Sequence, residues 1–196
     1  MDPIAPGQIT LGLLAGGRAR RLGGRDKAWL VRDGVPQVVR LSTRFGGQVS
    51  QVLVSANRDP ARFAAAGLVP VADRLADAGP IAALEALAAS CATPWLFTLP
   101  VDVLDANDCV LRTLNDARSD DGARARDDEG SQPLVALWRV ASLRVAVADA
   151  LGAGELAVHA LQSRLALAEV AFDGVRFGNL NTPGDLHAAG IALADA

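Results

Sequence analysis

The sequence predicts an α/β protein in which helices cover both faces of a mostly parallel sheet. Short apolar runs alternate with helix-forming segments along the chain, and strands that alternate with helices usually form parallel sheets. The hydrophobic fraction is 51% over 196 residues, which is enough for one domain with a sizeable core. No internal repeat and no long linker interrupts this pattern.

Each predicted strand is a short apolar run that ends in glycine, proline or polar residues. The first, "ITLGLL", runs into a glycine-rich stretch, and the fourth, "PWLFTLPVD", ends on a carboxylate. The predicted strands are residues 9–14, 51–57, 68–73, 94–102, 133–140 and 168–174.

The predicted helices lie between these strands and have recognisable starts or stops. "RDGVPQ" is a turn that leads into the first helix, Gly67 stops the second, and Pro80 begins the third. Later, "GAG" interrupts a helical stretch over 141–167, and a closing helix follows an Asn-rich turn. The polar segment 116–132 has mixed charge and is interpreted as a mobile loop or the tip of a hairpin.

Composition argues against several classes of function. With a net charge of −3, 4% aromatic residues and no tyrosine, the chain lacks the basic and aromatic surface typical of nucleic-acid binding. Its two cysteines and two histidines form no zinc-binding pattern. The N-terminus has no signal-peptide pattern, and no apolar run is long enough to span a bilayer. We therefore expect a cytoplasmic protein that binds neither nucleic acid nor a membrane.

The stretch "LAGGRARRLGGRDKAW", residues 14–29, concentrates four glycines, four arginines and a lysine between apolar segments. Glycine lets backbone amides converge on an anion, and arginine can grip phosphate oxygens with two hydrogen bonds. The stretch is interpreted as a phosphate-binding turn, to which a helix beginning just afterwards would add its positive end. It has neither a G-x-G-x-x-G nor a Walker A sequence, so a metal accompanying a triphosphate must be held elsewhere. An exposed basic loop is the alternative.

Polar residues end three predicted strands at the edge where parallel sheets bind their ligands. They are Asn57, Asp73 and Asp102. Because Mg²⁺ prefers one or two carboxylates together with phosphates and water, Asp102 is the candidate metal ligand. Capping of adjacent turns explains the two aspartates equally well, and a local turn hydrogen bond explains Asn57. Near the C-terminus, helix capping leaves Asn179 and Asn181 without a role.

Taken together, these segments resemble molybdenum cofactor guanylyltransferases, the MobA-type enzymes. "LAGGRARRLGG-RDK" matches a signature of L-A-G-G, a basic stretch with R-(M/L)-G-G, and D-K. The other matches follow in the family's order: "SANR" at 55–58, "ADRLADAGPIAAL" at 72–84, "LFTLPVD" at 96–102, "QPLVALW" at 132–138 and "NLNTP" at 179–183. The resemblance covers nearly the whole chain.

The resemblance implies a Rossmann-like nucleotidyltransferase fold. It implies a single domain over 1–196, with a nucleotide-binding half over about 1–105 and an acceptor-binding half over about 106–196. The implied ligands are GTP and Mg²⁺, and the acceptor is molybdopterin, the organic part of the molybdenum cofactor. Cofactor-delivery or molybdoenzyme-maturation proteins are further candidate partners. The L-A-G-G spelling favours GTP, since related cytidylyltransferases tend to read L-A-A-G.

The family's functional positions carry over onto residues of this chain. The implied nucleotide-binding residues are Leu14, Ala15, Gly16, Gly17, Lys27, Asn57, Asp73 and Asp102. In this set, Lys27 contacts the phosphates with help from Arg21, and Asp102 binds Mg²⁺. Asn57 and Asp73 hold the base or the ribose. Lys27, Arg21 and Asp102 are thus the implied catalytic residues for transfer of GMP from GTP to the molybdopterin phosphate, with release of pyrophosphate.

On the acceptor side, this chain matches the family in one element and departs from it in two. Asn179 and Asn181 match the N-x-N-T-P element near the acceptor pocket. "PVDVL" lacks the second proline of the family's P-C-D-x-P, and Glu155 and Leu156 stand where G-x-R-R-V usually supplies a basic pair. Two alternatives therefore stay open. One is a related nucleotidyltransferase that uses CTP or another phosphate acceptor, and the other is a non-catalytic GTP-binding relative.

Overall fold

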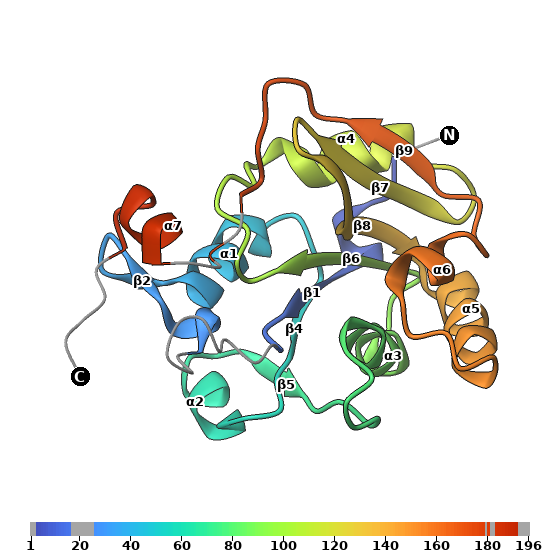
Figure 1. Cartoon of the computed structure of the whole chain (residues 1–196), viewed down its shortest axis with the longest axis horizontal. Coiled ribbons are helices and arrows are strands. Elements are labelled where there is room, and N and C mark those ends of the chain that lie inside the picture. Colours follow the sequence, from blue (N-terminus) through green and yellow to red (C-terminus); the bar gives the residue numbers. More distant parts are fainter. Residues whose placement is uncertain (1–2, 17–25, 179, 181–182, 192–196) are drawn as a thin grey trace.

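The computed structural model describes residues 3–16, 26–178, 180 and 183–191. Within these residues, one sheet has the strand order β5-β4-β1-β6-β8-β7-β9 (Figure 1). The strands are β1 (Ile9–Leu14), β4 (Gln51–Ser55), β5 (Val69–Val71), β6 (Trp95–Pro100), β7 (Gly122–Asp127), β8 (Gly130–Arg139) and β9 (Ala168–Ala171). In this sheet β8 runs against the rest, because β6 and β7 both pair with it antiparallel and the other neighbours pair parallel. The predicted mostly parallel sheet is confirmed.

Helices cover both faces of the sheet. The α-helices of the described residues are α1 (Gln37–Gly46), α2 (Pro60–Ala65), α3 (Pro80–Ser90), α4 (Cys109–Ala117), α5 (Val140–Gly152), α6 (Val158–Gln162) and α7 (Pro183–Ala188). Side chains of α1, α2 and α4 share one buried cluster, whereas those of α3, α5 and α6 share a second. Leu186 of α7 packs in a small third cluster with Leu30 and Leu180. None of the described helices is long and apolar enough to cross a membrane.

Helix α3 approaches the sheet closely at Gly12 of β1. A Cβ atom on Gly12 would lie 3.0 Å from Cδ1 of Leu87 in α3 and 3.0 Å from Cδ1 of Leu96 in β6. Such distances are tighter than ordinary packing contacts, so a larger residue would push its neighbours aside. Close packing therefore explains a glycine in the middle of an apolar strand.

The structure differs from the sequence-based expectation within 116–132. The hairpin-tip interpretation is confirmed for the turn between β7 and β8, but the loop interpretation is wrong for Gly122–Asp127, which is a strand. Ala123 and Ala125 are buried on the core side of this strand, and Arg124 and Arg126 reach Glu169 on β9. Alanine is depleted in strands, so this alternation of small and charged residues carries a weak strand signal.

A second difference follows the glycine-rich stretch. Lys27–Trp29 forms a single 3-10 turn (η3), and the chain continues into a two-stranded hairpin of β2 (Val31–Arg32) and β3 (Val35–Pro36) before α1 begins. The prediction that a helix begins just after the glycine-rich stretch, and adds its positive end to the phosphate site, is therefore wrong for these residues. The predicted "RDGVPQ" turn is confirmed as the tip of this hairpin, where Asp33 and Gly34 have φ of 52° and 77°, as the favoured type I′ turn requires.

Candidate functional site

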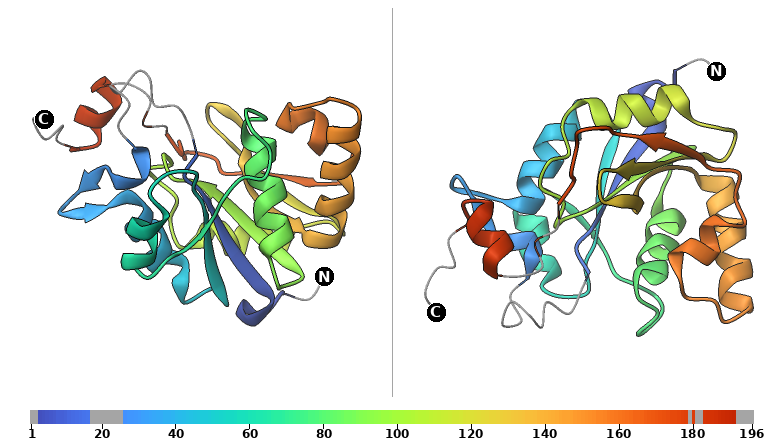
Figure 2. Two further views of the ribbon diagram at one scale, coloured as in Figure 1. Left: turned by 90° about the horizontal axis from the view of Figure 1, so that it is seen from below. Right: turned by 45° about the horizontal axis from the view of Figure 1, so that its top comes forward.

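The carboxyl ends of β1, β4 and β6 meet at one edge of the sheet, where the three strands run side by side (Figures 1 and 2). Backbone hydrogen bonds continue past the strands. The amide of Ala15 donates to the carbonyl of Ser55 at 3.0 Å, and the amide of Val101 donates to the carbonyl of Leu14 at 3.1 Å. These bonds bring the residues after each strand together, as the strand-end rule predicts.

Lys27 and Asp102 form an ion pair at this edge. Nζ of Lys27 lies 2.8 Å from Oδ2 of Asp102, and the two side chains are 20% and 18% exposed. The residues are 75 positions apart in the sequence, yet the sequence alone predicts a binding role for each of them. The structure therefore brings the predicted phosphate-binding lysine onto the predicted metal-binding carboxylate.

The position of Lys27 is fixed by its neighbours in the η3 turn. The carboxylate of Asp26 caps the turn by accepting a hydrogen bond from the amide of Ala28 at 2.9 Å, and Ala28 is fully buried. The ring of Trp29 packs 4.9 Å from that of Phe63, with the guanidinium of Arg62 at 4.0 Å on the Trp29 ring. Local capping and tertiary packing together hold the backbone of Lys27 next to Asp102.

The backbone around Asp102 is held from two directions. The carbonyl of Asp102 accepts a hydrogen bond from the amide of Leu180 at 3.2 Å. The carbonyl of Val103 accepts one at 2.7 Å from Nε2 of Gln37, a buried side chain at the start of α1. The loop after Asp102 lacks the family's second proline, and these hydrogen bonds restrict it instead.

Asn57 and Asp73 face each other across the ends of β4 and β5. Nδ2 of Asn57 donates to Oδ2 of Asp73, and the amide of Asp73 donates to Oδ1 of Asn57, both at 2.8 Å. Oδ1 of Asp73 accepts a further hydrogen bond from the hydroxyl of Ser55 at 2.8 Å. Asn57 therefore bonds to the next strand end and not simply to its own turn. Ser55 belongs to the "SANR" match, but the sequence assigns it no role of its own, because it is a single polar residue at the end of an apolar strand.

The donor set around Asp102 fits a metal that is shared with substrate phosphates. In the part of the chain that the structure describes, no three His, Cys, Asp or Glu side chains converge as a metal site. Mg²⁺ is usually held by one or two carboxylates together with phosphate and water oxygens. The ammonium of Lys27, at 2.8 Å from Asp102, shows that this carboxylate accepts a cation at hydrogen-bond distance. The residues present therefore fit a divalent ion whose remaining ligands are phosphate and water oxygens.

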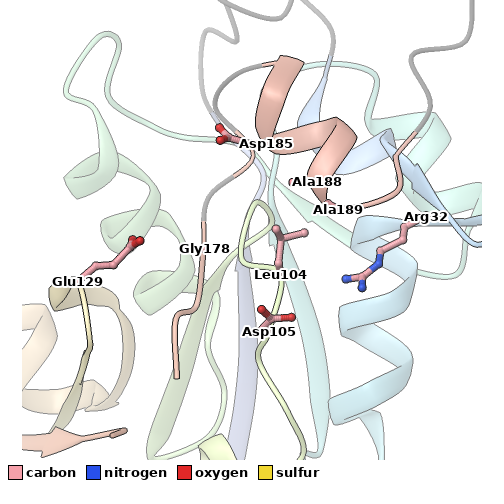
Figure 3. Close-up of a pocket in the computed structure, with 8 residues that line it drawn as sticks. All are labelled: Arg32, Leu104, Asp105, Glu129, Gly178, Asp185, Ala188 and Ala189. Carbon is pink, nitrogen blue, oxygen red and sulfur yellow. The ribbon is translucent and has the colours of Figure 1, made fainter. Parts of the chain in front are cut away.

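A pocket of about 430 Å³ adjoins this edge on the side of α7 (Figure 3). Leu104 and Asp105 enter it from the loop after Asp102, Arg32 from β2, and Glu129 from the turn between β7 and β8. Asp185 of α7 completes the charged lining, which carries three carboxylates and one guanidinium. The lining of this pocket therefore begins at Leu104, two residues after Asp102.

Several predicted positions lie outside the described residues, namely Gly17, Arg21, Asn179 and Asn181. Leu14 is the last residue of β1, and Ala15 and Gly16 follow it at the predicted edge. Leu180, between the two asparagines, is buried, and its amide donates to the carbonyl of Asp102.

The substituted family position at Glu155 lies away from the Figure 3 pocket. Oε2 of Glu155 lies 2.9 Å from Nη2 of Arg164. Glu155 is in the segment between α5 and α6, and Arg164 follows α6. Those helices lie at the opposite end of the molecule from α7 (Figures 1 and 2). The missing basic pair therefore does not alter the lining of this pocket.

The sheet order and the polar residues at its edge define the class of α/β proteins that bind ligands at the carboxyl ends of parallel strands. Comparison with known families identifies the member of this class. The family model described as "MobA-like NTP transferase domain" matches residues 12–168, and the chain belongs to this family. It is therefore a nucleotidyltransferase, and the resemblance seen in the sequence is confirmed.

Curated relatives cover almost the whole chain. A molybdenum cofactor guanylyltransferase of Yersinia pseudotuberculosis is 34% identical over 182 residues, spanning 90% of this chain and 92% of the relative. The protein of the same name from Cupriavidus taiwanensis is 34% identical over 196 residues, spanning 94% and 98%.

Solved structures share the fold at lower identity. Molybdopterin-guanine dinucleotide biosynthesis protein A of Archaeoglobus fulgidus superposes with a TM-score of 0.70 at 18% identity, covering 92% of this chain and 96% of that one. The 2-C-methyl-D-erythritol 4-phosphate cytidylyltransferase of Thermus thermophilus gives 0.66 at 19% identity, covering 91% and 96%. The predicted nucleotidyltransferase fold is confirmed.

Proposed function

We propose that this chain transfers GMP from GTP to the terminal phosphate of molybdopterin and releases pyrophosphate. Relatives named molybdenum cofactor guanylyltransferase, 34% identical over nine-tenths of the chain, support this assignment. The observation that carries it is the Lys27–Asp102 pair at the joined ends of β1 and β6. This pair supplies a cation for phosphate oxygens and a carboxylate for a metal at one place.

The reaction is a direct displacement at the α-phosphorus of GTP. An oxygen of the acceptor phosphate forms the new bond to phosphorus, and the bond from phosphorus to the bridging oxygen of pyrophosphate breaks. Both partners can be held in line, so no covalent enzyme intermediate is needed. When bound, Mg²⁺ would neutralise and align the phosphate oxygens. Lys27, with Arg21 and the amides of Gly16 and Gly17, stabilises the charge that moves onto the leaving pyrophosphate.

The nucleoside lies on the side of β4 and β5 in this proposal. Asn57 and Asp73 present an amide and a carboxylate at 2.8 Å from each other, and such groups can hydrogen-bond a base edge or ribose hydroxyls. Asp102 is the residue that would hold Mg²⁺. The single carboxylate implies that metal and nucleotide bind together, since substrate oxygens must complete the ligands of the ion.

The acceptor lies on the other side of Asp102. Asn179 and Asn181 are its proposed ligands. The pocket next to Leu180 presents the carboxylates of Asp105 and Glu129. Carboxylates accept hydrogen bonds, which suits the amino and ring NH groups of a pterin. Cofactor-delivery or molybdoenzyme-maturation proteins are proposed as partners that bring the acceptor or take the product, and we propose that the reaction takes place in the cytoplasm.

One incubation tests this function. The purified chain is mixed with GTP, Mg²⁺ and molybdate-loaded molybdopterin, and pyrophosphate is measured against reactions with CTP or ATP. We expect pyrophosphate with GTP alone among the three nucleotides. Preference for CTP, or turnover with a sugar phosphate in place of molybdopterin, would assign the chemistry to another substrate pair. Binding of GTP without pyrophosphate release would indicate a non-catalytic relative.

A further inference from the structure

Asp127, at the end of β7, is a buried carboxylate that the site described above does not use. It is 3% exposed. Its Oδ1 accepts hydrogen bonds from the amides of Glu129 and Gly130 and from Nε2 of Gln132, at 3.0, 3.1 and 3.1 Å. Its Oδ2 accepts one from the amide of Phe177 at 2.9 Å. One carboxylate thus joins the β7–β8 turn to a segment 50 positions further along the chain.

Phe177 in turn holds the loop that follows Asp102. The carbonyl of Phe177 accepts hydrogen bonds from the amides of Leu104 and Asp105 at 2.8 and 3.3 Å, and its ring is fully buried. We call these four residues, Asp127, Phe177, Leu104 and Asp105, the Phe177 junction. The junction connects three segments that are distant in the sequence, and one of them carries the metal-binding carboxylate.

Gly178 continues the chain away from the junction in a conformation that favours glycine. Its φ is +62°, and a Cβ atom there would lie 3.4 Å from Cδ1 of Leu104. Two residues later, the amide of Leu180 donates to the carbonyl of Asp102. The chain that leads from Phe177 towards the predicted acceptor ligands is therefore bound to the Asp102 loop at both ends.

The pocket in Figure 3 is built on this junction. Leu104 and Asp105 belong to it, and Glu129 and Gly178 are held directly beside it. A change at Asp127 would therefore move the pocket walls at Leu104 and Asp105, although Asp127 itself does not line the pocket. The backbone next to Asp102 is held separately, by the hydrogen bond from Gln37 to the carbonyl of Val103.

We propose that Asp127 is a positioning residue for the transfer reaction, acting through Phe177 to set the acceptor-side pocket against Asp102. The inference rests on the proposed function for the identity of the acceptor. It predicts a specific defect, because the junction does not touch Asn57 or Asp73. Acceptor use should suffer when the junction is broken, whereas GTP binding should persist.

The test compares Asp127→Asn with Asp128→Asn. Asparagine keeps the shape but has only one acceptor oxygen. With that oxygen facing the three donors at Glu129, Gly130 and Gln132, its NH₂ group faces the Phe177 amide and cannot accept that hydrogen bond. Asp128 is the matched control, an exposed neighbour whose carboxylate accepts one hydrogen bond, from the amide of Gly174 at 3.1 Å. Three quantities are measured for each protein: the Kd for GTP with Mg²⁺, kcat, and KM for molybdopterin.

We expect Asp127→Asn to lower kcat/KM for molybdopterin by about 10- to 100-fold, since small displacements of positioned groups cost that much. The GTP Kd should stay within about twofold of wild type, and Asp128→Asn should match wild type throughout. Equal kinetics for the two variants would overturn the proposal. So would a parallel loss of GTP binding and acceptor use in Asp127→Asn, which indicates general destabilisation.

Two further measurements keep the test decisive. If Asp127→Asn does not fold, Gly178→Ala perturbs the same junction without leaving a buried donor unpaired, and the same separation of GTP Kd from acceptor kcat/KM is expected. Hydrogen exchange of residues 101–106 without any substrate should be faster in Asp127→Asn than in Asp128→Asn. Faster exchange in a chain that releases no pyrophosphate would support the junction and reject the proposed function, whereas unchanged exchange would reject the junction.

Discussion

Replacement of Lys27 by alanine should separate catalysis from stability. The substitution removes the ammonium that lies 2.8 Å from Oδ2 of Asp102. In the proposed reaction this ammonium stabilises charge on the leaving pyrophosphate. Loss of one such preorganised group costs about 3 kcal/mol of barrier, or about two orders of magnitude in rate.

The cost in folding stability should be much smaller. The side chains of Lys27 and Asp102 are 20% and 18% exposed, so water can solvate Asp102 when its partner is removed. The pair therefore lies closer to surface ion pairs, which contribute up to about 1 kcal/mol, than to buried pairs, which cost about 3–5 kcal/mol to break. A loss of about 1 kcal/mol corresponds to a fall in Tm of about 2–4 °C for a domain of this size.

The assay is pyrophosphate release with GTP, Mg²⁺ and molybdopterin, measured beside a thermal melt. Arg164→Ala is the matched control, since it removes the cation of an ion pair of similar length. The Arg164–Glu155 distance is 2.9 Å against 2.8 Å for Lys27–Asp102, and Arg164 lies just after α6, outside the predicted site. That variant should keep its rate. A Lys27→Ala protein with near-normal turnover would refute the reasoning, as would a loss of activity that merely follows unfolding.

Three other changes test separate parts of the account. Asn57→Ala should weaken GTP binding by up to about tenfold by calorimetry, because a hydrogen bond to a neutral base or ribose group contributes about 0.5–1.5 kcal/mol; an unchanged Kd would remove Asn57 from the nucleotide site. Burial raises the pKa of the Asp127 carboxyl, but the hydrogen bonds from the Phe177 amide and its other donors together outweigh burial. The folded pKa of Asp127 therefore lies below its ordinary value. The stability this provides is present above the unfolded pKa of about 3.9 and is lost as pH falls through the folded value, so Asp127→Asn should flatten the acid limb of unfolding free energy below about pH 4. An acid limb identical to wild type would contradict this. Gly12→Ala should cost about 1–3 kcal/mol in denaturant unfolding, because its Cβ would meet Leu87 at 3.0 Å; a neutral result would show that α3 can move away.

Much of the sheet could be predicted because its strands carry a simple signal. The predicted bounds of 9–14 coincide with β1, since an apolar run there ends in glycine. β7 could not be predicted in this way. Its inward residues, Ala123 and Ala125, are small, and the strand is stabilised by Arg124 and Arg126 reaching Glu169 on a neighbouring strand. That contact depends on tertiary structure, which local residue preferences do not encode.

The site shows the same division. Asp102 could be selected because a carboxylate ends an apolar strand at the ligand-binding edge, and Lys27 because it follows a glycine-rich stretch. Their contact needs the whole sheet, since strand pairing brings the two segments together. Asp127 could not be distinguished from Asp128 in the sequence. Both are acidic residues in a polar segment, and their roles diverge because one side chain points inward and the other is exposed.

A crystal soaked with GTP and Mn²⁺, used as an anomalous stand-in for Mg²⁺, tests the central claim most directly. The account predicts a triphosphate at the joined ends of β1, β4 and β6. It also predicts an anomalous peak about 2 Å from a carboxylate oxygen of Asp102, with the Lys27 ammonium turned from that carboxylate to the phosphates. Nucleotide or metal bound elsewhere, with the Lys27–Asp102 pair intact, would contradict it.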